Sequence, residues 1–158
     1  MWIKGNKTNT LGKSGVYLIT FPNGKRYLGS SKDLYKRIST HMKNLQQKKQ
    51  VSWYFTASIE NNFPDYIPSG KPIYNKRRKR NKKYVAEYQS QLHKWLMKNP
   101  KVKPVWKYPD HYEYEIPWKY YTTLVDIKVC ICDNYREYES YLLQHIKNKE
   151  NYYNTNFR

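Results

Sequence analysis

The chain has little of what usually marks secreted or membrane proteins. Only two of its 158 residues are cysteines, Cys130 and Cys132. A disulfide across one intervening residue would be strained, and there is no second cysteine pair to complete a zinc site, so we expect reduced packing residues. No apolar run approaches the length of a membrane span, and the first residues lack the apolar core of a secretory signal. We therefore expect a cytoplasmic, intracellular protein with no membrane contact.

Acidic residues are also scarce, and this bounds the partner. The chain carries 30 Lys and Arg against 12 Asp and Glu, a net charge of +18, and 18 of its residues are tyrosine. A large cationic excess favours a polyanion, because Lys and Arg neutralise phosphates and release counterions. Aromatic rings among the cations favour nucleic acid, because they stack on bases. No protein partner is evident, and the Lys, Asn, Tyr and Ile bias suggests the AT-rich genome of a phage or low-GC bacterium.

The first part of the chain predicts a hairpin followed by a helix. Apolar and β-branched residues over 16–21 predict a strand, Asn23-Gly24 predicts a tight turn, and 26–29 predicts the return strand. Ser and Asp residues then offer a helix N-cap, and apolar residues at near-helical spacing predict a helix over 33–46.

Four side chains of this segment form a candidate site. Tyr17 and Tyr27 lie on the two strands, while Arg37 and His41 are four residues apart and share one edge of the helix. Each alone has an ordinary structural explanation: a packing tyrosine, a solvated arginine, a histidine at a helix edge. Together, phenols, a guanidinium and an imidazole suit phosphodiester hydrolysis.

The last part of the chain predicts a strand over 124–132 and a helix over 134–149. Glu139 falls within the apolar stripe of that helix, whereas Glu137 falls on its solvated face. A carboxylate on an apolar face is costly without a partner. Glu139 is therefore the candidate ligand of a divalent cation, and the alternative is a buried salt bridge to a Lys or Arg.

The middle of the chain is less regular. We expect a helix over 51–61, a Pro- and Gly-punctuated loop over 64–72, a helix from Tyr84 to about Pro100, and extended or irregular structure over 100–118. An almost wholly basic run, 76–83, precedes the second of these helices.

The motifs Gly15-Val16-Tyr17 and Tyr27-Leu28-Gly29, with the later Glu139 and the segment Asn151–Asn154, resemble the GIY-YIG nuclease family. The resemblance covers 14–62 and 124–156, and Val16 and Leu28 replace isoleucines of the family pattern without loss of apolar character. It implies an α+β fold in which a three-stranded antiparallel sheet is flanked by helices. The predicted organisation is a single domain over 1–158, with a basic helical and irregular insertion at about 63–123.

The resemblance also implies the chemistry, hydrolysis of double-stranded DNA with one divalent metal, Mg²⁺ or Mn²⁺. Glu139 would hold the metal, Arg37 would bind the scissile phosphate, and either Tyr17 or His41 would activate the attacking water. Tyr27 would orient water or phosphate, and Asn154 would support the site. The predicted catalytic set is Tyr17, Tyr27, Arg37, His41, Glu139 and Asn154.

The basic residues supply the predicted DNA contacts: Lys32, Lys36, Lys76, Arg77, Arg78, Lys79, Arg80, Lys82 and Lys83. A phage or mobile-element homing endonuclease is the interpretation we favour. A restriction enzyme or a structure-specific repair or junction nuclease of the same family is the alternative. A nucleic-acid-binding module without catalysis is a third interpretation, but it would not need Arg37, His41 and Glu139 in these places.

Overall fold

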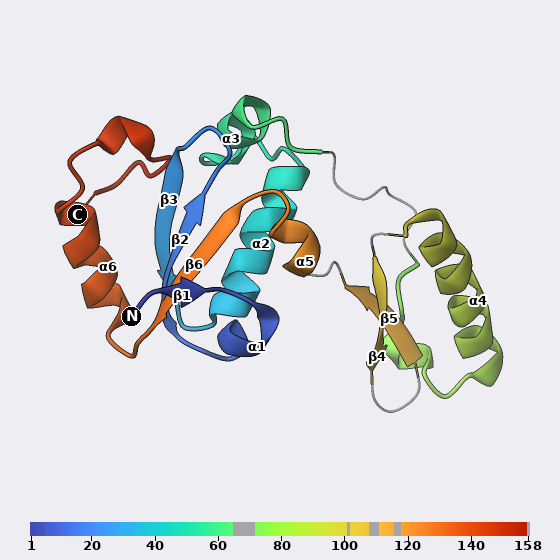
Figure 1. Cartoon of the computed structure of the whole chain (residues 1–158). Coiled ribbons are helices and arrows are strands. Elements are labelled where there is room, and N and C mark those ends of the chain that lie inside the picture. The colour runs from blue at the N-terminus through green and yellow to red at the C-terminus, as the bar shows by residue number, and fades with distance from the viewer. Residues whose placement is uncertain (65–71, 101, 108–110, 116–117, 158) are drawn as a thin grey trace. The chain divides into compact units, whose positions relative to one another are not determined.

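The computed structural model describes the whole chain except residues 65–71, 101, 108–110, 116–117 and 158 (Figure 1). Its contacts divide the chain into two compact units. Unit 1 comprises Met1–Tyr66 and Tyr121–Arg158, and unit 2 comprises Ile67–Tyr120. This division does not test the predicted single domain over 1–158 with an insertion at about 63–123, which stays a prediction. Most of the loop predicted over 64–72 lies outside the described residues.

Unit 1 is built around an antiparallel sheet with the strand order β1-β6-β2-β3. The strands are β1 (Ile3–Lys4), β2 (Gly15–Thr20), β3 (Arg26–Ser31) and β6 (Asp126–Ile131). Both β2 and β3 are built from the hairpin motif, and their register pairs Tyr17 with Gly29. Because β2 and β6 are central, β3 is an edge strand of the sheet.

The predicted three-stranded sheet is corrected to four strands. The extra strand is β1, whose two residues pair with Val129 and Lys128 of β6. Two residues are too few to show the period-two alternation that identifies a strand, and their partner lies far along the chain. The α+β class and the antiparallel sheet flanked by helices are confirmed.

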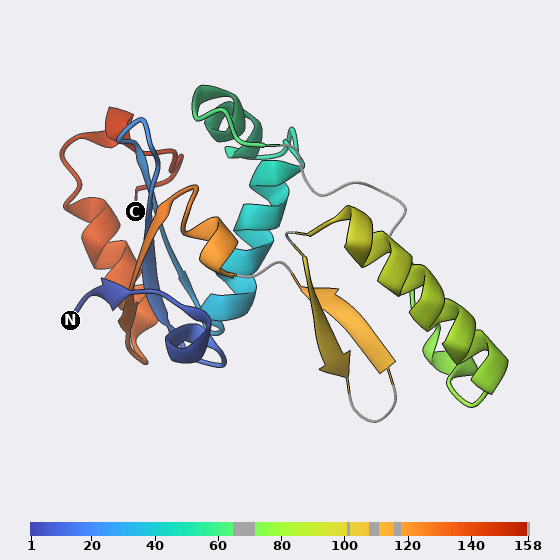
Figure 2. The same cartoon turned by 45° about the vertical axis from the view of Figure 1, so that its right-hand side comes forward.

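Helices cover both faces of this sheet, as Figures 1 and 2 show. On one face lies α6 (Tyr135–Gln144), where Leu143 packs with Val16 and Leu28. On the other lies α2 (Leu34–Gln46), whose apolar side chains are fully buried and whose N-cap is Asp33. The alternation of strand side chains thus sends Val16 toward α6 and Tyr17 toward α2. None of the helices in the described part of the chain has the length and apolar character of a bilayer span.

The shorter helices of unit 1 are α1 (Lys7–Thr10), α3 (Tyr54–Glu60) and η2 (Lys149–Asn151), and α5 (Trp118–Tyr121) lies where the chain leaves unit 2. The predicted helix over 51–61 begins three residues late, and that over 134–149 ends early, at Gln144. The stripe of α6 continues to Ile146, but His145 already caps the helix through its backbone N–H.

Unit 2 has its own small core. It contains η1 (Lys76–Arg78), α4 (Lys82–Lys98), β4 (Lys103–Lys107) and β5 (His111–Glu115), with the two strands paired antiparallel. The core comprises Tyr88, Leu92, Trp95 and Val102. The Tyr88 hydroxyl donates a hydrogen bond of 2.9 Å to the Tyr112 carbonyl and so ties α4 to β5.

Candidate active site

The predicted site residues of unit 1 gather around β3, the edge strand of the sheet. Tyr17 lies on the neighbouring strand, Arg37 and His41 lie on α2, and Glu139 approaches from α6 on the opposite face. Groups from both faces of the sheet therefore lie around the outer edge of β3.

Tyr17 is buried under this site, with 1% of its surface exposed. Its ring lies over Gly29 of the neighbouring strand β3. A Cβ atom at position 29 would overlap the Tyr17 hydroxyl and the adjoining ring carbon. Only glycine at position 29 leaves the space that the phenol occupies. Burial raises the pKa of Tyr17 well above its usual range, Tyr27 adds to the rise, and Arg37 opposes it. Tyr17 is therefore a neutral phenol near pH 7.

His41 joins two phenols. Its Nε2 lies 2.5 Å from the Tyr17 hydroxyl, and its Nδ1 lies 2.7 Å from the Tyr54 hydroxyl. Burial, with a smaller effect of the Arg37 charge, lowers the pKa of His41 to about 3. The imidazole is thus neutral, with one N–H donor and one acceptor nitrogen for its two phenol partners.

Arg37 and Tyr27 form the more accessible part of the cluster. Partial burial alone would lower the pKa of Arg37, but the Tyr17, Tyr54 and Tyr27 phenols outweigh it and raise the pKa. The guanidinium stays charged and exposed, ready to bind a phosphate. Burial raises the pKa of Tyr27 against the opposing charge of Arg37, so this phenol is also neutral.

Glu139 faces a pocket of about 470 Å³ that Tyr27, Trp53 and Asn154 also line. Its Oε1 accepts a hydrogen bond of 2.8 Å from the Ser30 hydroxyl. It is half-buried, whereas Glu137 is exposed, so the structure separates the two carboxylates as the helical stripe predicted.

This pocket suits a hard divalent cation. Mg²⁺ is held through one or two carboxylates and keeps several waters for substrate oxygens. One carboxylate beside amide and hydroxyl oxygens meets that requirement. Elsewhere, too, the described residues contain no group of three or more His, Cys, Asp and Glu side chains that could hold a metal ion. Glu139 is the residue that would hold the ion.

The side-chain amide of Asn154 forms two hydrogen bonds with the backbone of β3. Its Oδ1 accepts from the Leu28 N–H at 3.0 Å, and its Nδ2 donates to the Leu28 carbonyl at 2.8 Å. The preceding Tyr153 N–H donates to the Arg26 carbonyl at 2.8 Å. The segment after η2 therefore pairs with the outer edge of β3, and the Asn154 side chain binds the strand backbone there.

An aromatic stack connects Tyr27 to the interior. Trp53 stacks on Tyr27, with ring centroids 4.1 Å apart, and on Tyr153, with centroids 6.0 Å apart. The Trp53 ring thus packs against Tyr27 at the pocket and links it to Tyr153.

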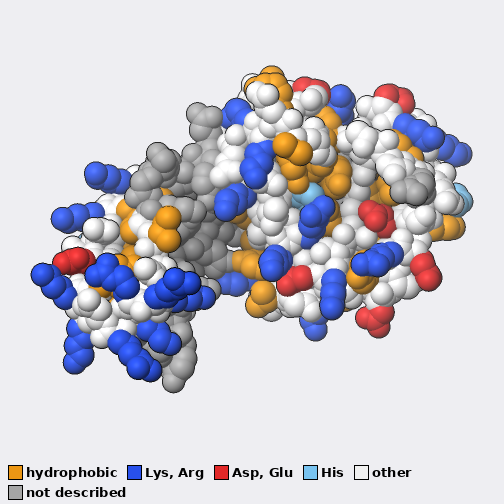
Figure 3. Space-filling model, turned by 180° about the vertical axis from the view of Figure 1, so that it is seen from behind, with side chains coloured by type: hydrophobic (Ala, Val, Ile, Leu, Met, Phe, Trp, Pro, Cys, Tyr) orange, Lys and Arg blue, Asp and Glu red, His pale blue; other side chains and the backbone are white. Residues whose placement is uncertain are grey.

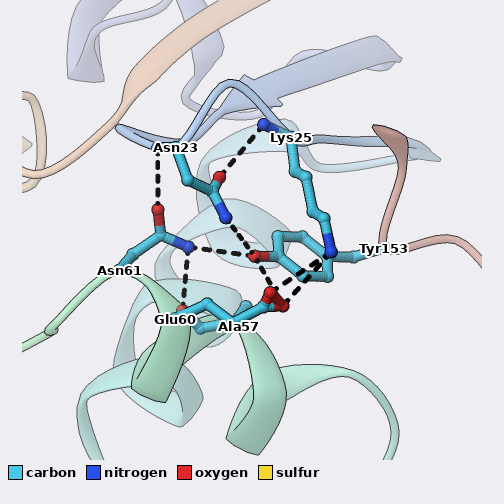
Figure 4. A network of polar contacts seen from close by, with 6 residues as sticks. All are labelled: Asn23, Lys25, Ala57, Glu60, Asn61 and Tyr153. Carbon is cyan, nitrogen blue, oxygen red and sulfur yellow. Dashed lines mark hydrogen bonds and ion pairs between the residues drawn. The ribbon is translucent and has the colours of Figure 1, made fainter. Parts of the chain in front are cut away.

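A polar network fixes the other end of this stack (Figure 4). The Tyr153 hydroxyl accepts hydrogen bonds of 3.0 Å from the side-chain amides of Asn23 and Asn61. Lys25 forms an ion pair of 3.2 Å with Glu60, beside the same hydroxyl. The β2–β3 turn, the end of α3 and the C-terminal segment are thereby joined at one point.

The predicted DNA-contact residues lie in two places. Lys32 and Lys36 are exposed at the end of β3 and the start of α2, close in sequence to Arg37. The run 76–83 lies in unit 2, and all of its basic side chains are exposed. Unit 2 contains fourteen Lys and Arg against four Asp and Glu, a net charge of +10. On the face shown in Figure 3, Lys and Arg side chains dominate the part that unit 2 forms.

Three residues of the site were missed by the sequence reasoning: Tyr54, Trp53 and Ser30. The helix carrying Tyr54 has weak apolar periodicity, and nothing in its spacing from His41 indicates a hydrogen bond. Ser30 follows the second motif directly, and its place opposite Val16 in the register could have directed it to the α6 face.

The comparisons with known proteins agree with the motifs. A family model described as the GIY-YIG catalytic domain matches residues 13–154. Neither a search of curated proteins nor a search of solved structures found a match for the chain.

Proposed function

The chain belongs to the GIY-YIG nuclease family, and from this premise we propose that it is a metal-dependent, site-specific endonuclease of double-stranded DNA. The observation that carries the proposal is the convergence of a Tyr17–His41 pair, a charged Arg37 and a carboxylate, Glu139, at the edge of β3. A binding module would need the cations but not a buried phenol–imidazole pair behind them.

The role proposed for each residue follows from its exposure. Arg37 is the exposed cation, so it binds the scissile phosphate and stabilises charge that develops in the transition state. Tyr27 lines the pocket and orients water or phosphate. A divalent cation held by Glu139 would polarise the phosphate and stabilise the leaving oxygen.

Tyr17 and His41 form the proton acceptor. In the free protein the Arg37 charge acts on the Tyr17 phenol and opposes the rise of its pKa. A bound phosphate would draw the guanidinium toward itself and leave the Tyr17 hydroxyl open to water. As water attacks phosphorus, its proton passes to the Tyr17 oxygen while the Tyr17 proton passes to His41 Nε2. The raised pKa of Tyr17 disfavours a standing phenolate, and the lowered pKa of His41 keeps the imidazole neutral, with one ring nitrogen open to a proton.

Recognition of a particular sequence is assigned to the basic unit 2. Its positive charge supports binding to the DNA backbone, and its own core gives it a defined binding surface. A nuclease with such an added element fits a homing role in a phage or mobile element.

The proposal is tested by incubating plasmid and genomic DNA with the protein in Mg²⁺, Mn²⁺ or EDTA and sequencing the new ends. Metal-dependent cuts at few recurring sites support a site-specific enzyme. Cuts only at branched or damaged DNA would favour the structure-specific alternative. Binding without any cleavage in either metal would reject the enzyme.

A further inference from the structure

The imidazole of His41 has a hydrogen-bonding partner at each nitrogen, and only one of them, Tyr17, belongs to the predicted catalytic set. The second, Tyr54, lies 2.7 Å from Nδ1, and its residue is only 9% exposed. A neutral imidazole can donate from only one nitrogen, so the two phenols must take different roles.

We propose that Tyr54 is a positioning residue that holds His41 in the tautomer with its proton on Nδ1, which leaves Nε2 free to accept the Tyr17 proton. The inference rests on the proposed function for its catalytic consequence, but the tautomer itself is a property of the folded protein.

The neighbours of Tyr17 decide which phenol donates to His41. The positive charge of Arg37 acts on the Tyr17 phenol and opposes the rise of its pKa, and a guanidinium has only donor groups. Because a positive charge repels a hydroxyl proton, we infer that the Tyr17 O–H is turned away from Arg37 and donates to Nε2 of His41, which lies 2.5 Å away. With Nε2 accepting, Nδ1 must carry the proton and donate to the Tyr54 oxygen.

The fold holds Tyr54 firmly in this place. It is the first residue of α3, and its ring packs against Trp53 with centroids 4.8 Å apart. The Ser58 hydroxyl of α3 donates to the Leu45 carbonyl of α2, which carries His41. The distance between the two helices is thus fixed by contacts other than the Tyr54–His41 bond.

The arrangement also suits the proton transfer. When Nε2 takes the Tyr17 proton, the Tyr17 O–H bond breaks and an N–H bond forms, so His41 becomes an imidazolium with two N–H groups. Tyr54 already accepts the Nδ1–H bond, and this charge-assisted bond strengthens without any further movement of a proton.

The experiment compares the wild type with Tyr54→Phe and with Tyr135→Phe. Tyr135 is a matched control because it is a tyrosine of α6 that packs in the cluster on the other face of the sheet. Two quantities are measured: the ¹⁵N shifts of the histidine ring nitrogens, with His41 assigned by its loss in His41→Gln, and the single-turnover cleavage rate at saturating protein.

We expect wild-type His41 to show a protonated Nδ1 and an unprotonated Nε2. In Tyr54→Phe the proton should shift to Nε2 or exchange between the nitrogens, and cleavage should slow by about 10–100-fold, less than removal of an acid–base group itself costs. DNA affinity should not change, and Tyr135→Phe should match the wild type in both measurements.

A wild-type His41 with its proton on Nε2 would overturn the inference, as would a Tyr54→Phe protein with an unchanged tautomer and rate. If the wild type cleaves no DNA, the proposed function fails while the nitrogen shifts still decide the tautomer. The wild-type spectrum alone shows which nitrogen carries the proton, so the inference can be rejected even if the Tyr54→Phe protein does not fold.

Discussion

At the scale of the residue, the site depends on groups whose protonation the fold has fixed. Tyr17 and Arg37 are the two that the proposed chemistry uses most directly. Tyr17→Phe and Arg37→Ala should each lower the single-turnover cleavage rate by about 10²–10⁴-fold, because each removes a positioned group that acts in the transition state. Binding of uncleaved DNA in Ca²⁺ should weaken far less. A loss found wholly in affinity would make them contact residues.

The burial of His41 should also make the stability of the protein depend on pH. Burial, with Arg37, lowers its folded-state pKa to about 3, whereas histidine in an unfolded chain titrates near about 6.5. Between these values the unfolded state binds one more proton, so stability falls as the pH falls, by up to about 1.4 kcal/mol per pH unit. Lowering the pH from 7 to 5 should therefore cost the wild type about 2 kcal/mol more than His41→Gln. Urea unfolding at both pH values measures this, and equal losses would mean that His41 titrates normally in the fold.

At the scale of the element, α3 is held by the polar network around Tyr153. Tyr153→Phe keeps the ring against Trp53 but leaves the amides of Asn23 and Asn61 without this acceptor. We expect a loss of about 1–2 kcal/mol. Amide hydrogen exchange should quicken in α3 and remain unchanged in β6. Equal protection of α3 in the variant and the wild type would show that the network does not secure the helix.

The elements also show how far sequence reasoning extends. The helix α2 and the strand β6 were placed within two residues, because each has a clear apolar period and a recognisable end. The strand β1 was missed because two residues are too few to show an alternating pattern. Their pairing with Val129 and Lys128 is a long-range contact that local sequence does not indicate. The pairing of β4 with β5 was also missed, since prolines and aromatics obscure the alternation there.

The residues of the candidate site also fall into those that the sequence could predict and those that it could not. Tyr17, Tyr27, Arg37 and His41 could be grouped because a hairpin and one helix bring them together locally. Glu139 could be singled out from its place on an apolar stripe. Tyr54 could not be found, since its role depends on how α3 packs against α2, and no periodicity in the chain encodes that packing.

At the scale of the whole molecule, the charge is divided unequally, and this gives a prediction about salt. Replacing Arg77, Arg78, Lys79 and Arg80 with Ser should flatten the log–log salt dependence of DNA binding by roughly two to four units, because each phosphate that a cation neutralises adds about 0.9 to the slope. The chemical step at saturating protein should barely change.

Lys4 and Lys128 offer a control for this effect. They pair across β1 and β6, at the edge of the sheet opposite to β3, and both are exposed. Replacing them with Ser should change the slope by less than about one unit. If the two variants flatten the slope equally per charge, the run 76–83 has no special contact with DNA.

The role of Glu139 is tested by single-turnover cleavage of a plasmid that the wild type cuts, with Glu139→Ala and Glu137→Ala compared in Mg²⁺ and in EDTA. The two carboxylates are two residues apart on α6, but only Glu139 lines the pocket beside Tyr27 and Asn154. We expect Glu139→Ala to fold and to bind DNA but not to cut it. Glu137→Ala should retain most of the wild-type rate in Mg²⁺ and lose it in EDTA. Cleavage that survives in Glu139→Ala, or that fails equally in both variants, would show that Glu139 is not the metal ligand.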